Sequence, residues 1–210
     1  NNHSYAMDKN EKLIMVIPRK ERFSIGHFEG FEGKKDYAKI IESHFQHMKR
    51  GEVEYNFDYK QPVGYVIIVN KPLKKVFAYQ RAIHSDNYRE TRLQGKWSWG
   101  VGGHVDKEDG VGMAAVEASV LRELAEEISC KVKCLKHTGY INYENNSIGK
   151  AHFGLLYIAE TDDTNVTPKD KEMSHGELKT LPEIETISKT QDVEEWSLIA
   201  LDAVKKYLNN

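Results

Sequence analysis

The feature that most constrains the fold is a pair of apolar, β-rich runs that stand close together in the chain. Val63 to Val69 and Lys75 to Tyr79 are rich in valine, isoleucine and aromatic residues, and they are separated by a short segment containing Asn70-Lys71-Pro72. Two such runs around turn residues are typical of a β-hairpin. We therefore expect a sheet that contains at least one antiparallel pair of strands.

Strand-type and helix-type segments occur in mixed order around this hairpin. The expected elements are a strand at Leu13 to Ile17, helices at Asp36 to Met48, Gly112 to Ile128 and Asp192 to Leu208, strands at Lys131 to Asn142 and Ala151 to Ala159, and a polar loop at Thr161 to Gly176. This order argues against simple βαβ winding. The sequence predicts an α/β fold with a mixed sheet packed between helices.

The length of the chain, 210 residues, suits one main domain with a small extension. We assign residues 60–210 to the main domain and residues 8–59 to an N-terminal α/β extension. Asn1 to Ala6 look polar and arbitrary, so residues 1–7 are expected to be an expression remnant, with Met7 as the natural start.

Composition and charge narrow the range of partners. The chain is 40% hydrophobic and 30% charged, with a formal net charge of −2, so it has no basic field that would attract nucleic acid or an anionic membrane. The apolar runs are far shorter than the ~20 residues of a membrane span, and no secretory signal pattern opens the chain. We expect a soluble, cytoplasmic protein that binds no nucleic-acid polymer and no membrane. Aromatic residues from Tyr55 to Tyr59 are consistent with a homodimer.

Three glutamates share one face of the predicted helix Gly112 to Ile128. At 100° per residue, Glu123, Glu126 and Glu127 fall within an arc of about 100°, while Leu121, Leu124 and Ile128 cluster on the other side and are expected to be buried. Like charges at this spacing repel unless a cation lies among them, and Mg²⁺ prefers carboxylate oxygens. An acidic face in contact with solvent is the alternative explanation.

The residues around this acidic face favour the metal interpretation. Gly102-Gly103 precedes the helix and permits close approach of backbone carbonyls, and Arg122 could orient a carboxylate with two hydrogen bonds. Together, Gly-Gly-His-Val-Asp at 102–106 and Arg-Glu-Leu-Ala-Glu-Glu-Ile at 122–128 resemble the Nudix box, Gly-x5-Glu-x7-Arg-Glu-U-x-Glu-Glu-x-Gly-U with U aliphatic.

The resemblance implies a Nudix-like α/β/α sandwich with a mixed sheet, and an enzyme that hydrolyses a diphosphate linkage in a nucleoside diphosphate derivative or a related small molecule. It further implies that Glu123, Glu126, Glu127 and the Gly102 carbonyl hold Mg²⁺ or Mn²⁺, while Arg122 orients the acids. Glu126 is expected to be the least replaceable of them.

The sequence departs from the pattern at three places. The segment between Gly103 and Arg122 is five residues longer, which places an insertion around Lys107 to Val111. Ala114 stands where the pattern has its first glutamate, so that acid is missing or comes from one of three residues, Glu108, Asp109 or Glu117. Ser129 and Cys130 replace the glycine and the aliphatic residue that end the box, which concerns helix termination more than chemistry.

Further candidate residues lie outside the box. A family acid usually comes from a later loop, and we favour Glu172 over Glu144 and Glu177 as a base or metal ligand, although a solvated loop acid is equally compatible with the sequence. For substrate binding the candidates are Arg81 and His104 at phosphate, and Trp97 or Trp99 at a nucleobase while the other tryptophan packs inward. The alternatives are a surface arginine for Arg81, a residue that caps the turn for His104, and core packing for both tryptophans.

Two other functions are compatible with parts of the sequence. Isopentenyl diphosphate isomerases share the fold and a similar glycine-histidine stretch, but their pattern has a catalytic cysteine in the preceding strand, and this chain has no cysteine before Cys130. A non-catalytic, nucleotide-sensing Nudix domain is the other alternative, and the intact glutamates argue against it.

Overall fold

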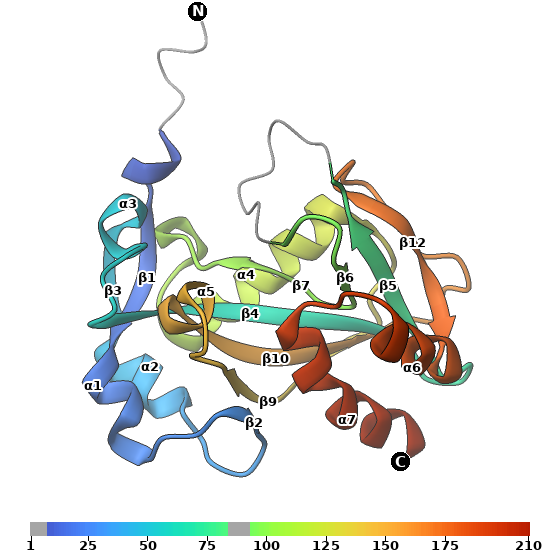
Figure 1. Ribbon diagram of the computed structural model, residues 1–210. Coiled ribbons are helices and arrows are strands. Elements are labelled where there is room, and N and C mark those ends of the chain that lie inside the picture. Colours follow the sequence, from blue (N-terminus) through green and yellow to red (C-terminus); the bar gives the residue numbers. More distant parts are fainter. Residues whose placement is uncertain (1–7, 84–92) are drawn as a thin grey trace, which may run out of the picture. The chain divides into compact units, whose positions relative to one another are not determined.

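The computed structural model describes residues 8–83 and 93–210. The predicted expression remnant at residues 1–7 lies outside the described residues. The chain forms a mixed sheet with helices, the α/β fold expected from the sequence (Figure 1). It divides into two compact units, each assembled from three segments. The first unit contains the described residues up to Gly64, Gly103–Val120 and Gly139–Leu155, and the second contains Tyr65–Gly102, Leu121–Thr138 and Leu156–Asn210.

The first unit is organised around β1 (Leu13–Pro18), whose four central residues are buried. This strand pairs antiparallel with β3 (Gln46–Lys49) and with the start of β4 (Tyr59–Asn70). The other elements here are α1 (Arg19–Arg22), β2 (Gly30–Glu32), α2 (Ala38–His44), α3 (Arg50–Val53), α5 (Ser147–Ala151) and parts of β9 (Cys134–Asn142) and β10 (His152–Glu160).

One predicted helix in this unit is too long. The pattern over Asp36 to Met48 predicts a single helix, but α2 ends at His44 and the chain enters β3. Residues of β3 pair with β1 in the register Leu13↔Lys49 to Val16↔Gln46. Pairing with the edge of β1 satisfies the backbone hydrogen bonds of this segment. Such tertiary contacts override the helical spacing of its apolar residues.

The second unit contains the predicted hairpin. Its sheet has the strand order β12-β5-β4-β10-β9, where β5 is Lys75–Arg81 and β12 is Met173–Thr180. The pairs Val69↔Val76 and Asn70↔Lys75 join β4 to β5 next to the turn, so the hairpin is confirmed. The remaining elements are β6 (Trp97–Ser98), the first two residues of β7 (Val101–His104), β8 (Ile128–Ser129), β11 (Thr167–Pro168), α6 (Leu181–Thr190) and α7 (Glu195–Asn209).

The predicted polar loop Thr161 to Gly176 is partly wrong. It contains β11, which pairs with β8, and the beginning of β12, which pairs with β5. Helix α6 was not predicted, although its capping box between Thr180 and Glu183 and its proline in the first turn are local start signals.

Helix α4 (Gly112–Glu127) matches the predicted glutamate helix. Ala115, Val116, Val120 and Leu124 form its buried face, whereas Leu121, expected to be buried, is 51% exposed. Leu121 follows Val120 by 100° on the helix and so falls outside the stripe made by residues four apart. In the first unit, the carboxylate of Glu42 accepts a hydrogen bond from the Met113 amide at 2.7 Å and caps this helix from α2.

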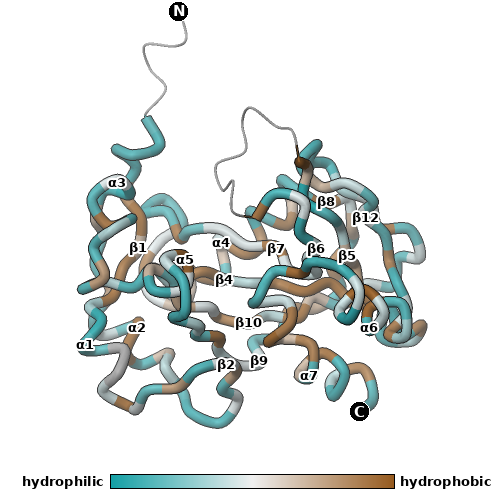
Figure 2. The backbone as a smooth tube through the Cα atoms, in the orientation of Figure 1, coloured by the Kyte–Doolittle hydropathy of each residue, from teal (hydrophilic) through white to brown (hydrophobic). Residues whose placement is uncertain are grey.

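Hydrophobic residues concentrate in the strands, as the brown stretches of β1, β4 and β10 show in Figure 2. Within the described part of the chain, no helix combines the length and the apolar character that crossing a membrane requires.

Candidate active site

The last turns of α4 carry the glutamates that the sequence singled out. Arg122 Nη1 lies 3.0 Å from Glu123 Oε1, and both side chains are partly buried. This contact is the one expected of an arginine that orients a carboxylate. Glu126 is exposed and Glu127 is half-buried, so the neighbouring acids meet different surroundings.

Glu127 is the most strongly perturbed of these acids. The pKa of Glu127 is raised to about 8, first by burial and then by the carboxylates of Glu123, Asp170 and Glu126, while the Arg81 guanidinium acts in the opposite direction. A neighbouring carboxylate disfavours the ionised form of Glu127, and a neighbouring guanidinium favours it. Three carboxylates thus favour the protonated form of Glu127, and the guanidinium group of Arg81 favours the ionised form.

Asp170 reaches this position because the end of α4 is tied to a later loop. The Lys169 amide donates to the Glu127 carbonyl at 2.7 Å, and Lys169 Nζ donates to the Ala125 carbonyl at 3.0 Å. The pairing of β11 with β8 brings the same loop to the residues that directly follow the helix. Two distant segments thus place one more carboxylate beside Glu127.

The donor set suits a hard divalent cation. Carboxylate oxygens are the ligands that Mg²⁺ and Mn²⁺ accept most readily, and a cation would favour the ionised form of Glu127. The three helix glutamates are not drawn into a tight group, since among residues 8–83 and 93–210 only His27, Glu29 and Glu144 bring ligand atoms within 4.8 Å of one another. The approach of the Gly102 carbonyl to the helix acids stays a prediction.

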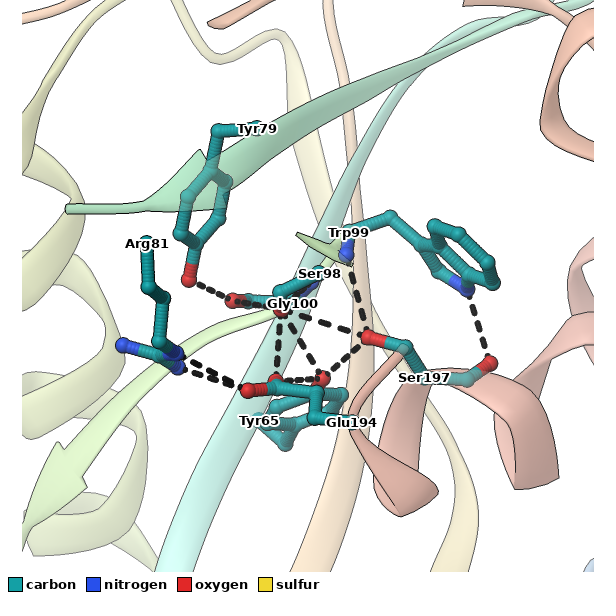
Figure 3. Close-up of polar contacts among 8 residues, drawn as sticks. All are labelled: Tyr65, Tyr79, Arg81, Ser98, Trp99, Gly100, Glu194 and Ser197. Atoms are coloured by element: carbon teal, nitrogen blue, oxygen red, sulfur yellow. Dashed lines mark hydrogen bonds and ion pairs between the residues drawn. The ribbon is translucent and has the colours of Figure 1, made fainter. Parts of the chain in front are cut away.

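Arg81 is anchored by a buried carboxylate, as Figure 3 shows. Its Nε and Nη2 atoms each lie 2.9 Å from one oxygen of Glu194, which is 5% exposed and occupies the N-cap of α7. The other oxygen of Glu194 accepts hydrogen bonds from the hydroxyls of Tyr65 and Ser98. A buried carboxylate with these partners is fully compensated, so the guanidinium is held in one place.

The same network fixes the chain just before Gly102. Tyr79 donates its hydroxyl hydrogen to the Gly100 carbonyl at 2.7 Å, and the Trp99 amide donates to Ser197 Oγ at 3.0 Å (Figure 3). A Cβ atom at Gly100 would lie 1.9 Å from the ring of Tyr65, so only glycine fits there. The segment leading into β7 is consequently held by side chains from β4, β5 and α7.

The predicted substrate residues do not all come together. Arg81 lies close enough to Glu127 to influence its pKa. Trp97 pairs with Gln80 in β5, and because successive strand residues face opposite sides, it lies on the face away from Arg81. Trp99 is 1% exposed and donates its indole hydrogen to the Ser197 carbonyl, so it packs inward. His104 belongs to the first unit, where its Nε2 lies 3.4 Å from Nε2 of His152.

The other predicted acids lie in different surroundings. Glu172 is half-buried, and its amide donates to a carboxylate oxygen of Asp170 at 2.9 Å. Glu144 pairs with Lys60 and Arg19 in the first unit, and Glu177 pairs with Lys179 in the second. Glu108 and Glu117, the possible replacements for the missing box glutamate, are exposed. Asp109, the third one, accepts a hydrogen bond from the Asp106 amide.

Comparison with known proteins gives a consistent result. The family model of the NUDIX domain matches residues 60–206. The protein YmaB of Bacillus subtilis is 32% identical over 214 residues, which cover 95% of this chain and 100% of the relative. Tm1382, described in its crystal structure as a candidate Nudix hydrolase, superposes with a TM-score of 0.77 at 26% identity over 94% of this chain and 99% of its own.

A more distant structure shares the fold alone. The NUDIX domain of NrtR from Shewanella oneidensis, solved with ADP ribose, has a TM-score of 0.53 at 16% identity, and the match covers 71% of this chain and 88% of that one.

Proposed function

The chain belongs to the NUDIX family of hydrolases, and from that premise we propose that it is a divalent-metal-dependent pyrophosphohydrolase. Its substrate would be a nucleoside diphosphate derivative or a related small molecule with a diphosphate linkage. The observation that carries this proposal is the half-buried Glu127, surrounded by Glu123, Glu126 and Asp170, with its pKa raised to about 8. Such a cluster of acids is stabilised when a cation binds it.

In this proposal Glu123, Glu126 and Glu127, with the Gly102 carbonyl, hold Mg²⁺ or Mn²⁺. A bound ion of this kind lowers the pKa of water and neutralises charge on phosphoryl oxygens. Asp170 joins the acidic group, and Glu172, bonded to it through its amide, is retained as the candidate base.

The cationic residues have separate roles. Arg122 orients Glu123, which it contacts at 3.0 Å. Arg81, anchored on Glu194, is assigned to the diphosphate, because its guanidinium group lies near enough to the acidic group to act on the pKa of Glu127. The hydrolase domain would extend over residues 60–210, with residues 8–59 as an extension that shapes specificity.

The decisive experiment is a hydrolysis screen over diphosphate compounds, with Mg²⁺, Mn²⁺ and EDTA arms. ADP-ribose comes first in the panel because the NrtR domain was solved with it. Activity that disappears in EDTA and in Glu127→Gln, but survives in Glu52→Gln, supports the proposal. Glu52 is a suitable control because it is exposed and lies in α3, outside the acidic group.

The same screen separates the alternatives. Binding of ADP-ribose with no release of phosphate-bearing products by any metal-loaded sample would identify a sensing domain. Interconversion of isopentenyl and dimethylallyl diphosphate would identify an isomerase. Either result overturns the hydrolase proposal.

A further inference from the structure

Tyr79 of β5 contacts two groups on which the proposed hydrolase depends (Figure 3). The guanidinium group of Arg81 lies over its ring, with 5.5 Å between Cζ and the ring centroid. The Tyr79 hydroxyl donates a hydrogen bond to the Gly100 carbonyl at 2.7 Å. One side chain therefore touches the arginine assigned to the diphosphate and the segment that leads to the Gly102 carbonyl.

Tyr79 lies on the face of β5 that is turned toward the end of α4. Tyr79 and Arg81 are two residues apart on this strand, so their side chains project from the same face. Both interact electrostatically with Glu127. Tyr79 is 1% exposed, so packing holds its ring in one place beside the acidic group.

The Gly100 carbonyl depends on Tyr79 for its hydrogen bond. The Ser98 hydroxyl lies 3.1 Å from the same oxygen, but its single hydrogen serves one acceptor, and a Glu194 oxygen at 2.5 Å is closer and charged. Burial raises the pKa of Tyr79, so its hydroxyl remains a hydrogen donor at neutral pH. Loss of this donor would leave a buried carbonyl oxygen poorly satisfied.

The bond to Gly100 bears on Gly102 through the short stretch of backbone between them. Gly102 is the second residue of β7, which pairs with β4. Planar peptide units and the extended backbone of a strand leave few free rotations over two residues. A shift of the Gly100 carbonyl would therefore be transmitted to the carbonyl of Gly102.

We propose that Tyr79 is a positioning residue of the hydrolytic site: its hydroxyl sets the Gly102 carbonyl for the divalent metal ion, and its ring sets Arg81 for the diphosphate. This inference rests on the proposed function and deepens it. It makes the binding of metal and the binding of substrate depend on separate parts of one side chain.

The first test is Mn²⁺ binding without substrate, measured from the electron paramagnetic resonance signal of the free ion. Tyr79→Phe removes the hydroxyl and keeps the ring, so it should bind Mn²⁺ about tenfold more weakly than the wild-type protein, as is typical when a group that holds a metal ligand is removed. Tyr207→Phe is the matched control, because the Tyr207 hydroxyl donates to a Glu160 oxygen outside this network. It should bind Mn²⁺ with wild-type affinity. Circular dichroism verifies that both variants are folded under the assay conditions.

The second test separates the ring from the hydroxyl by kinetics. At saturating Mn²⁺, with ADP-ribose or the panel compound that is hydrolysed fastest, Tyr79→Phe should keep the wild-type KM. Tyr79→Leu also removes the ring beneath Arg81, so its KM should be about fivefold higher than that of Tyr79→Phe, which corresponds to ~1 kcal/mol. A merely structural role would lower the stability of both variants without separating metal affinity from KM.

Equal Mn²⁺ affinity of Tyr79→Phe and the wild-type protein overturns the inference, and so does an equal KM of Tyr79→Leu and Tyr79→Phe. Both results come from a wild-type protein that binds Mn²⁺ and hydrolyses a diphosphate, so they leave the hydrolase proposal standing. A wild-type protein that binds no Mn²⁺ contradicts the hydrolase proposal itself, and the inference falls with it.

Discussion

Glu126 and Glu127 are neighbours in the chain, yet the fold gives them different surroundings. Glu127 is half-buried and its pKa is raised, whereas Glu126 is exposed at the end of the same helix. An exposed carboxylate can rotate toward a cation without a desolvation cost, and a buried one is held in place before the cation arrives. Both properties would serve the metal site proposed above, where the two acids have complementary roles.

Replacing Glu126 by glutamine should leave the fold intact, because the two side chains have similar size and helix propensity. The metal-supported rate should fall about a thousandfold, which corresponds to ~4 kcal/mol of transition-state stabilisation at ~1.4 kcal/mol per tenfold. Turnover at saturating Mg²⁺ is the measurement, with Glu52→Gln, at an exposed residue of α3, as the control. A rate within threefold of the wild type would contradict the role assigned to Glu126.

Replacing Glu194 by glutamine should destabilise the protein by about 3 kcal/mol, because it removes the charge that compensates Arg81 in a largely buried pair. Urea denaturation monitored by circular dichroism gives this difference. Glu195→Gln is the matched control, since Glu195 is the next residue and lies at the start of α7. Equal stability of the two variants would show that the ion pair contributes nothing.

The residues that the sequence identified and those that it missed differ in a physical way. Glu123, Glu126, Glu127 and Arg122 belong to one helix, so their spacing alone defines a shared face. Asp170 and Glu194 acquire their positions through contacts between distant segments: β11 with β8 in one case, and the pairing with Arg81 in the other. No local pattern marks either residue.

Among the elements, α4 has an N-terminus that depends on another helix. The carboxylate of Glu42 in α2 accepts the Met113 amide hydrogen, in place of a capping side chain next to the helix in sequence. Helices begin with unpaired amides, and a side-chain acceptor at this position contributes ~1 kcal/mol. The start of the glutamate helix thus relies on a contact over seventy residues away in sequence.

Glu42→Ala should therefore lower the free energy of unfolding by about 1 kcal/mol. Glu42→Gln should cost less, because the amide oxygen of glutamine can still accept the hydrogen bond. Thermal melts of the two variants beside the wild-type protein test this order. If both variants melt at the wild-type temperature, the cap is absent in solution.

The prediction of elements succeeded where burial and local signals agreed. The hairpin of β4 and β5 and the long helices α4 and α7 have strong apolar patterns, and the structure confirms them. Strand β3 was predicted as the end of a helix, because its residues become a strand only by pairing with β1. Short strands of this kind are defined by their partners, which a single sequence does not reveal.

For the whole molecule, the raised pKa of Glu127 predicts how stability depends on pH. Folding raises this pKa from 4.5 to about 8, so the folded state binds the proton more tightly than the unfolded state between these values. Without metal, the contribution of Glu127 to stability is present below about pH 4.5 and is lost as the pH rises toward about 8.

Thermal melts in EDTA from pH 5 to pH 8 should show this decrease in the wild-type protein. Glu127→Gln should remove that part of the pH dependence, since glutamine does not titrate. Addition of Mg²⁺ should restore stability most strongly near pH 8, where the carboxylate is ionised and can bind the ion. An identical pH profile in the variant would refute this origin of the effect.

The anchoring of Arg81 by Glu194 also has a consequence for the order of events during translation. The ribosome synthesises β5, which carries Arg81, long before it adds Glu194. Until then the Arg81 guanidinium group and the hydroxyls of Tyr65 and Ser98 lack the carboxylate that they bind in the folded protein. The second unit also needs the segment after Leu156 to complete its sheet. A nascent chain that stalls before residue 194 should therefore be susceptible to proteolysis in the region of β5. Protection of this region should appear only when the last part of the chain has been synthesised.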